Sequence, residues 1–306
     1  MGNAIYAKGS RPFQRVRRPK PTGFRGGLLL LLLWITTSTH LTAVGSRQTE
    51  NLILITLDGV RIEEMFAGID LKVLRLVNKK GRLVDHPLYR KFWAPTPKQR
   101  RAKLMPFFWG TWMRESGSIF GNRSQSSNVL ISNRHRFSYP VYSEILTGEA
   151  HDDVIDSNEN RQNPFPTVLD FLRDRLSLTA DKVGAFASWD TMRWIATHQK
   201  GSITANAGYE PYSHPEAEQL SRLQFETMTP WASVRHDFYT FELAMIYLKS
   251  HRPRIFFLSL GETDDWAHEG NYGRTLEALL QSDDRMRQLW TTCGEPLSTK
   301  ARPPLC

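Results

Sequence analysis

The sequence predicts an α/β protein with a mostly parallel central sheet and helices on both faces. Two short apolar runs, Leu52–Leu57 and Ile255–Leu260, are rich in Ile, Leu and Phe, and turn or polar residues follow each of them. Such runs are typical of strands buried on both faces, as parallel sheets contain. A third run is Val183–Ala187, and helix-like segments separate the three. Strands that alternate with helices favour a single α/β domain.

The remaining segments are assigned from their apolar spacing and turn residues. Helical character is predicted over 72–83, 104–115, 138–148, 168–176, 191–197, 238–249 and 276–290, and residues 60–66 are either the start of a helix or an irregular lid. Loops are expected at 87–101 and 201–215, and short strands at 118–121 and 129–131. We expect the last helix to present four charged residues to solvent: Asp283, Asp284, Arg285 and Arg287.

The first 45 residues have the plan of a signal peptide or signal anchor. Seven basic residues and no acid precede the apolar run Leu28–Ile35, and small residues follow at Ala43 and Gly45. A basic segment, a short apolar run and small residues in this order direct a protein out of the cytoplasm. We therefore expect a periplasmic or secreted body, which stays anchored to the membrane through this segment if the segment is not cleaved.

The charge disfavours a nucleic-acid-binding protein, and the cysteine content disfavours a protein built on disulfides or on a cysteine zinc site. The formal net charge is +9, of which the leader supplies +7, so +2 is left for the rest of the chain. A body so weakly basic does not predict a nucleic-acid partner. The two cysteines, Cys293 and Cys306, lie near the C-terminus and indicate neither a disulfide framework nor a cysteine zinc site. Any metal would therefore have oxygen and nitrogen ligands.

Two polar residues lie where a buried element ends or begins. Asp58 follows the first predicted strand, and in open α/β sheets the active crevice lies outside the carboxyl ends of the strands. Ser138 precedes Pro140 and a helical segment, which places it at a helix N-terminus, where backbone N–H groups stabilise negative charge. Asp58 could bind a metal, and Ser138 could act as a nucleophile with help from a base or metal. The alternatives are a turn aspartate and a plain N-cap serine.

Asp264 and His268 form an Asp-x-x-x-His pair just past the strand predicted at Ile255–Leu260. In a helix this spacing lets both side chains face one way. Carboxylate oxygen and imidazole nitrogen suit zinc, manganese or iron. The alternative is a surface salt bridge. The order along the chain is thus an acid, a hydroxyl and then Asp-x-x-x-His.

With these residues the sequence resembles the alkaline phosphatase superfamily, closest to its type I phosphodiesterase/nucleotide pyrophosphatase-like and sulfatase-like branch. The resemblance is carried by Ile53–Arg61, Phe137–Gly148 and Glu262–His268. It extends over residues 51–290. The joint order and spacing of the three motifs is more specific than any one of them.

The resemblance implies two divalent metal ions, usually zinc, at the carboxyl ends of the strands. Asp58 would bind the metal that activates the nucleophile, and Ser138 would be that nucleophile and contact the same metal. Asp264 and His268 would bind the other metal. Two cations would clamp the attacking and leaving oxygens of an in-line displacement, with a phospho- or sulfo-serine intermediate. The implied substrate is a small-molecule phosphate or sulfate ester.

The resemblance breaks near the C-terminus. The family has an Asp-His pair and a further His as metal ligands after the Asp-x-x-x-His, but no His follows His268 here, and Asp85-His86 precedes Ser138. Residues 291–306 show no periodicity. We therefore expect a truncated or frameshifted chain with three parts: a leader at 1–45, an alkaline phosphatase-like domain at 46–290 that is incomplete at its C-terminal end, and an aberrant tail at 291–306.

Three functions compete on this basis. The first is an extracytoplasmic metal-dependent hydrolase of phosphate or sulfate esters with a serine nucleophile, impaired by the loss of C-terminal ligands. The second is a non-catalytic relic or binding protein of the same fold. The third, a membrane- or nucleic-acid-associated binding protein, rests on the basic leader and ranks last. No cysteine lies near position 138, which disfavours a cysteine-type sulfatase.

Overall fold

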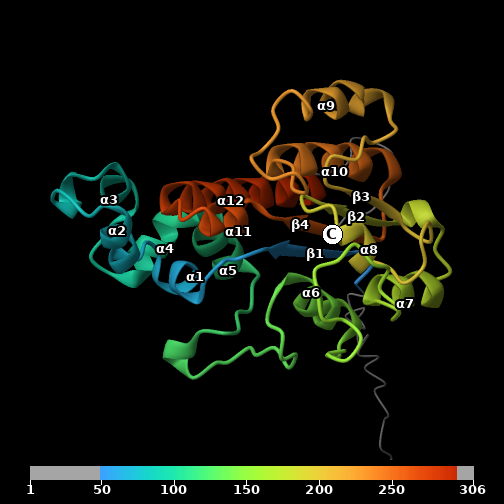
Figure 1. Cartoon of the computed structure of the whole chain (residues 1–306), viewed down its shortest axis with the longest axis horizontal. Coiled ribbons are helices and arrows are strands. Elements are labelled where there is room, and N and C mark those ends of the chain that lie inside the picture. Colours follow the sequence, from blue (N-terminus) through green and yellow to red (C-terminus); the bar gives the residue numbers. More distant parts are fainter. Residues whose placement is uncertain (1–48, 295–306) are drawn as a thin grey trace, which may run out of the picture. The chain divides into compact units, whose positions relative to one another are not determined.

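Four parallel strands form the central sheet in the order β1-β4-β2-β3 (Figure 1). β1 (Leu52–Leu57) and β2 (Val183–Ala187) both pair with β4 (Ile255–Leu260), and β3 (Thr204–Ala207) pairs with β2. The computed structural model describes residues 49–294. The three strands predicted from apolar runs are confirmed. β3 lies within the segment 201–215, where the sequence predicts a loop. The strand was not predicted because a run of four residues is too short to show a clear periodicity.

Helices of varied length connect these strands. In chain order they are α1 (Ile62–Ala67), α2 (Leu71–Val77), η1 (Leu83–Asp85), α3 (Pro87–Phe92), α4 (Pro97–Leu104), η2 (Phe108–Trp112), α5 (Met113–Glu115), η3 (Arg123–Gln125), α6 (Ser138–Thr147), α7 (Val168–Arg175), η4 (Ala180–Lys182), α8 (Met192–Ile195), η5 (Pro215–Ala217), α9 (Glu218–Leu223), α10 (Asp237–His251), α11 (Glu262–His268) and α12 (Tyr272–Gly294). Of the helices in this described part, none has the length and apolar character needed to cross a bilayer.

Helices cover both faces of the sheet. On one face, residues of α6, α7 and α8 share a core cluster with Ala185 of β2 and Phe257 of β4. On the other face, α10 and the end of α12 share a cluster with Phe186 of β2 and Phe256 of β4. Neighbouring residues in a strand point to opposite faces, so one strand supplies both clusters. The predicted α/β class with a parallel sheet is confirmed.

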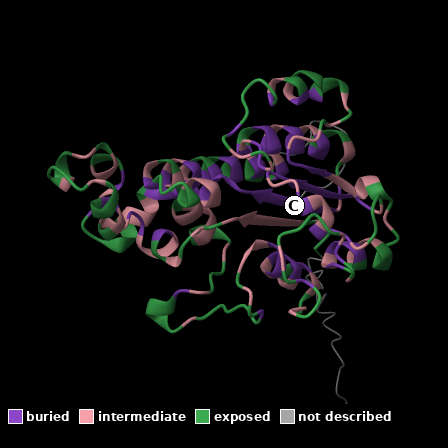
Figure 2. Ribbon diagram, in the orientation of Figure 1, coloured by how far each residue is buried: buried purple, intermediate pink, exposed green. Residues whose placement is uncertain are grey.

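β1 is less buried than predicted. The apolar run suggested a strand buried on both faces, but β1 lies at the edge of the sheet and its residues are half-buried or exposed, whereas β2 and β4 are buried throughout (Figure 2). Its outer side has no partner strand among residues 49–294. The prediction of full burial is wrong because an apolar run does not reveal a strand's position in the sheet.

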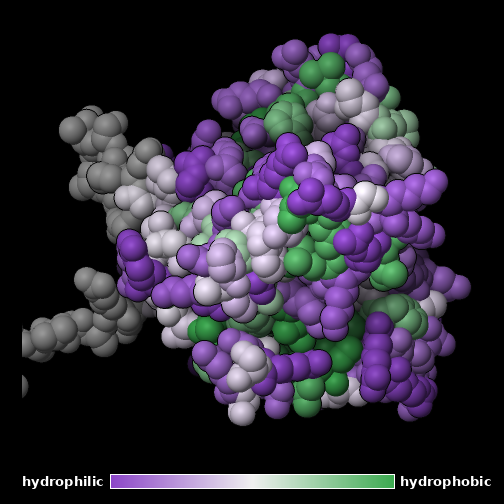
Figure 3. Space-filling model, turned by 90° about the vertical axis from the view of Figure 1, so that its left-hand side faces the viewer, coloured by the Kyte–Doolittle hydropathy of each residue, from purple (hydrophilic) through white to green (hydrophobic). Residues whose placement is uncertain are grey.

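The strands predicted at 118–121 and 129–131 are also wrong. Both segments are irregular, and their apolar side chains face solvent: Phe120 is 72% exposed and Leu130 is 75% exposed. A cavity of about 670 Å³ between this region and β1 is lined by Ile53 and Phe120, among others. Apolar side chains are also exposed elsewhere, as in α2. Figure 3 views the molecule from the side of α2 and α3 and shows apolar areas among hydrophilic ones.

The loop predicted at 87–101 contains two helices instead. Pro87 and Pro97 begin α3 and α4, at the first helical position, where a missing N–H costs nothing. The Nδ1 atom of His86 accepts a hydrogen bond from an N–H of the first turn of α3, and Thr96 forms a capping box with Gln99 at the start of α4. Proline therefore marks helix starts here and not the loop that the sequence predicts.

The last helix is longer than predicted, and two of its charged side chains that we expect at the surface are buried. α12 runs on through residues 291–294, and Cys293 packs in the core. Asp283 and Arg285 are buried, not solvent-facing, and Asp283 accepts hydrogen bonds of 2.8 Å from the N–H groups of Phe107 and Phe108. Asp284 and Arg287 are exposed as expected. The predicted leader and the rest of the predicted tail lie outside the described residues.

Candidate functional site

Neighbouring strand ends bring Asp58 and Asp264 together. The N–H of Asp58 donates to the carbonyl of Leu260 at 3.0 Å, so the chain leaves β1 and β4 side by side. Gly261 is the N-cap residue of α11, and Asp264 lies in the first turn of that helix. Gly59 has a φ of +66°, and a Cβ added there would lie 2.5 Å from Oδ1 of Asp264. The turn after β1 therefore needs glycine, both for its backbone and for the close approach of Asp264.

Ser138 reaches Asp58 from a third element. It is the first residue of α6, and its Oγ lies 3.4 Å from Oδ2 of Asp58. The usual O–H···O distance is about 2.7 Å, so this contact is loose, as catalytic hydrogen bonds often are before substrate binds. Phe137 is the N-cap residue, which removes the plain N-cap alternative for Ser138.

His268 contacts only one of the other predicted site residues. Its Nε2 lies 3.2 Å from Oδ2 of Asp264, one helical turn away, and its side chain is 78% exposed. Both the metal-ligand pair and the surface salt bridge are compatible with this geometry. The structure thus places Asp58, Ser138 and Asp264 around the neighbouring ends of β1 and β4, with His268 at the exposed margin.

The site carries an excess of negative charge. Burial, and next the charge of Asp264, raise the pKa of Asp58 to about 6, while hydrogen bonds from Gly59 N–H and Ser138 oppose this rise. Burial also raises the pKa of Asp264, and His268 opposes it. The neighbouring Asp265 has its pKa raised to about 8, first by burial and then by the charge of Asp264. These acids repel one another when ionised, so the site favours a proton or another cation.

Sequence reasoning missed several residues of this region. Tyr142 lies one turn after Ser138 on α6, and the charge of Asp58 adds to burial in raising its pKa. Asp237, fully buried at the start of α10, accepts hydrogen bonds from Ser188 Oγ at 2.6 Å and Gly261 N–H at 2.8 Å. The four-residue spacing from Ser138 could have indicated Tyr142. Nothing local indicates Asp237, because its place depends on the packing of α10 against the strand ends.

A second acid–imidazole pair lies on another side of α11. The Nδ1 of His236 lies 2.7 Å from Oε1 of Glu262, and this hydrogen bond raises the pKa of His236. Glu262 is buried, and its other oxygen accepts the backbone N–H of Asp237 at 3.3 Å. The pair therefore links the start of α10 to the start of α11 and helps to fix the helix that carries Asp264.

The donor atoms fit a divalent cation, but the described residues do not assemble the two-metal centre that the resemblance implies. Carboxylates that raise one another's pKa are suited to a hard cation, which prefers oxygen ligands. Within residues 49–294, however, no three side chains of His, Cys, Asp or Glu gather in a group able to hold a metal ion. Asp58 and Asp264, which lie close together, would supply only part of the ligands that the resemblance implies.

Comparisons with protein-family models, with curated proteins and with solved structures each found no match to this chain. Family membership and the alkaline phosphatase-like form of the α/β fold therefore stay predictions from the sequence motifs.

Proposed function

We propose that this chain derives from extracytoplasmic metal-dependent hydrolases of phosphate or sulfate esters with an alkaline phosphatase-like fold. Ser138 is the nucleophile of this proposal. Asp58, Ser138, Asp264 and His268 are the residues that would hold the metal ions that the resemblance implies, with zinc as the first candidate and manganese or iron as alternatives. The observation that carries the proposal is the 3.4 Å contact between Ser138 Oγ and Asp58 Oδ2, across 80 residues of sequence.

The residues themselves support a proton transfer from Ser138. Asp58 has its pKa raised to about 6, so at neutral pH it is ionised yet more basic than an ordinary carboxylate. Its Oδ2 faces the serine hydroxyl, and Ser138 begins a helix of ten residues, whose N-terminus favours developing negative charge. A bound metal would further lower the pKa of the hydroxyl and offset charge on the attacked ester.

A second candidate is a protein of this fold that binds a cation or an ester without turning it over. It is favoured by the absence of any three-ligand group among residues 49–294. Structural zinc sites have four ligands and catalytic ones at least three from the protein, so a two-carboxylate site would hold metal weakly.

The test compares three chromogenic substrates with the full chain and added zinc: p-nitrophenyl phosphate, bis(p-nitrophenyl) phosphate and p-nitrophenyl sulfate. We expect one of them to be hydrolysed and Ser138→Ala to lower kcat at least about a hundredfold. The control is Ser250→Ala, which removes an exposed serine in the last turn of α10. Equal turnover by Ser138→Ala would contradict the serine mechanism. Zinc binding without turnover of any substrate would support the second candidate.

A further inference from the structure

A cavity of about 280 Å³ lies beside β3, away from Asp58 and Ser138. It is lined by the end of α8, the turn at 199–202 and the start of β3, with Arg193, Trp194, Lys200 and Glu210 as its main polar residues. Its size is near the lower end of the range for small-molecule sites. Nothing in the proposed hydrolase mechanism uses it.

Three buried atoms of these residues have no hydrogen-bond partner in the described part of the chain: Arg193 Nε, Trp194 Nε1 and Glu210 Oε2. Buried polar atoms are nearly always paired, because leaving one unpaired costs free energy. Three such atoms around one cavity indicate that water or a ligand in the cavity completes their hydrogen bonds. Two of the three are donors, and the third is a carboxylate acceptor.

The charges in this cavity are placed next to each other. Arg193 and Lys200 both lie over the ring of Trp194, with 5.1 Å and 5.9 Å from the charged group to the ring centroid. Glu210 adjoins one of these cations: its Oε2 is 3.8 Å from Nη1 of Arg193. A ligand that satisfies both signs must therefore carry its own opposite charges on neighbouring atoms.

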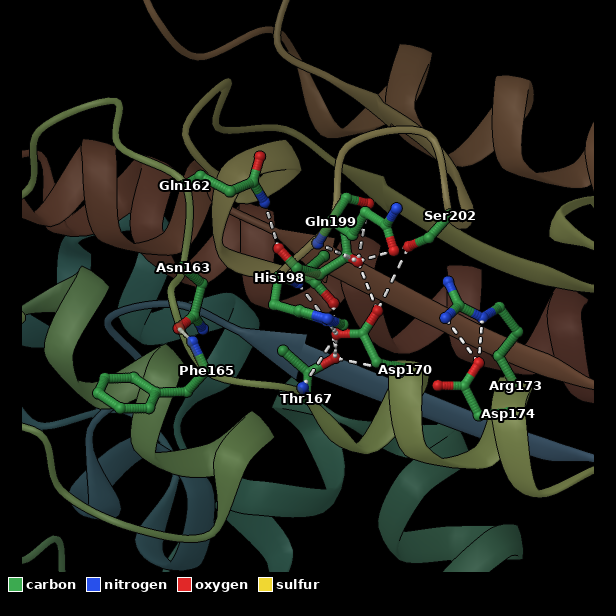
Figure 4. A network of polar contacts seen from close by, with 12 residues as sticks. Gln162, Asn163, Phe165, Thr167, Asp170, Arg173, Asp174, His198, Gln199 and Ser202 are labelled. Carbon is green, nitrogen blue, oxygen red and sulfur yellow. Dashed lines mark hydrogen bonds and ion pairs between the residues drawn. The ribbon is translucent and has the colours of Figure 1, made fainter.

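The wall of the cavity is held rigidly by a buried carboxylate (Figure 4). Asp170 of α7 accepts hydrogen bonds from Thr197 Oγ1 at 2.5 Å and from His198 N–H at 3.0 Å. Gln162 donates to the carbonyls of Trp194, at 3.2 Å, and of Thr197. The end of α8 and the turn that carries Lys200 are thus fixed before any ligand arrives, which lowers the entropic cost of binding.

We propose that this cavity binds an α-amino acid in its zwitterionic form. The ligand carboxylate faces Arg193, Lys200 and the indole N–H of Trp194, and the ligand ammonium faces Glu210. In an α-amino acid the two charges sit on adjacent carbons, which matches the 3.8 Å between the opposite charges of the cavity. Ile203 and Ala205, with the Trp194 ring, line the cavity and suit an aliphatic side chain.

The probe is L-valine, titrated calorimetrically into the full chain. Two matched compounds each lack one charge: isovalerate has no ammonium, and isobutylamine has no carboxylate. We expect L-valine to bind with a stoichiometry of one, and both matched compounds to bind roughly tenfold to a hundredfold more weakly, since each leaves a charged partner unpaired. Equal or tighter binding of isovalerate or of inorganic phosphate would overturn the proposal in favour of a general anion site, as would no binding of L-valine.

Two variants assign the contacts. Glu210→Gln keeps the size of the side chain, and we expect it to abolish the preference for L-valine over isovalerate. Lys200→Ala changes an exposed residue, so folding should be unaffected. This variant should weaken the binding of L-valine and of isovalerate by the same factor. The control is Lys249→Ala, which removes an exposed lysine in the last turn of α10 and should change the affinity for neither compound. An unchanged preference in a folded Glu210→Gln variant, verified by circular dichroism, would contradict the assignment.

Discussion

Two carboxylate centres in this protein differ in how their charge is balanced. Burial alone would raise the pKa of Asp170, yet hydrogen bonds from Thr197, Thr167 and His198 bring it below its ordinary value. At the strand ends, burial and neighbouring acids raise the pKa of Asp58 to about 6 and that of Asp265 to about 8. Donors surround the first centre, and mainly other acids surround the second.

This difference separates a structural acid from a candidate functional one. A carboxylate that accepts several hydrogen bonds connects segments and stabilises the fold in its ionised form. Neighbouring acids that lack such donors lower the stability of the folded state when they ionise. Clusters of such acids are typical of sites that bind a cation or transfer a proton. Substitutions at the two centres should therefore change the free energy of unfolding in opposite directions.

The largest effect is expected at Asp170. Asp170→Asn should lower the free energy of unfolding by about 3 kcal/mol, because it removes the charge that several buried donors share. Urea denaturation at pH 7 measures this value. Asp153→Asn is the control: its side chain is 91% exposed, so the change should stay within about 0.5 kcal/mol. A loss below about 1 kcal/mol for Asp170→Asn would show that the network is not structural.

The next effect is a pH dependence caused by Asp265. Its folded pKa of about 8 lies above the ordinary 3.8, so between these values the folded state holds more protons than the unfolded state. Stability should therefore fall as the pH rises through this window, by about 2 kcal/mol between pH 5 and pH 8 after allowance for solvent screening.

Asp265→Asn should remove most of this fall. Urea denaturation at both pH values, with a chelator present, compares the variant with the unmodified chain. Asp170 has the opposite sign: its lowered pKa adds stability above pH 3.8 that is lost as the pH falls below it. A fall that persists in the Asp265→Asn variant would refute the assignment.

The smallest effect is expected for Asp58→Asn. Removing one of several mutually repelling charges should raise the free energy of unfolding by about 1 kcal/mol at pH 8 in chelator, opposite in sign to Asp170→Asn. The same variant should lose the hydrolase activity that we propose. A loss of stability as large as that of Asp170→Asn would mean that the two centres do not differ.

Much of the sheet could be predicted from the sequence. The runs at 52–57, 183–187 and 255–260 are strands because several branched or apolar residues in succession suit a buried sheet. The edge position of β1 could not be predicted, since an apolar run gives no information on which strands pair. The helices at 87–92 and 97–104 were missed because their prolines and caps resemble a loop locally.

The site was predicted in part. The contact between Asp58 and Ser138 follows from placing a strand end and a helix start at one edge of a parallel sheet. Asp237 could not be found this way, because nothing near it in the sequence shows that it will be buried at the strand ends. The cavity beside Arg193 likewise depends on segments that meet only in the folded chain.

The most direct test of the proposed cation site is the effect of zinc on the free energy of unfolding. Excess free zinc should raise stability over the value in chelator, by about 2.7 kcal/mol once free zinc reaches a hundred times the dissociation constant. Asp264→Asn should abolish this rise, and Asp284→Asn, which changes an exposed acid on α12, should retain it. No rise in the unmodified chain, or an equal rise in Asp264→Asn, would contradict the account.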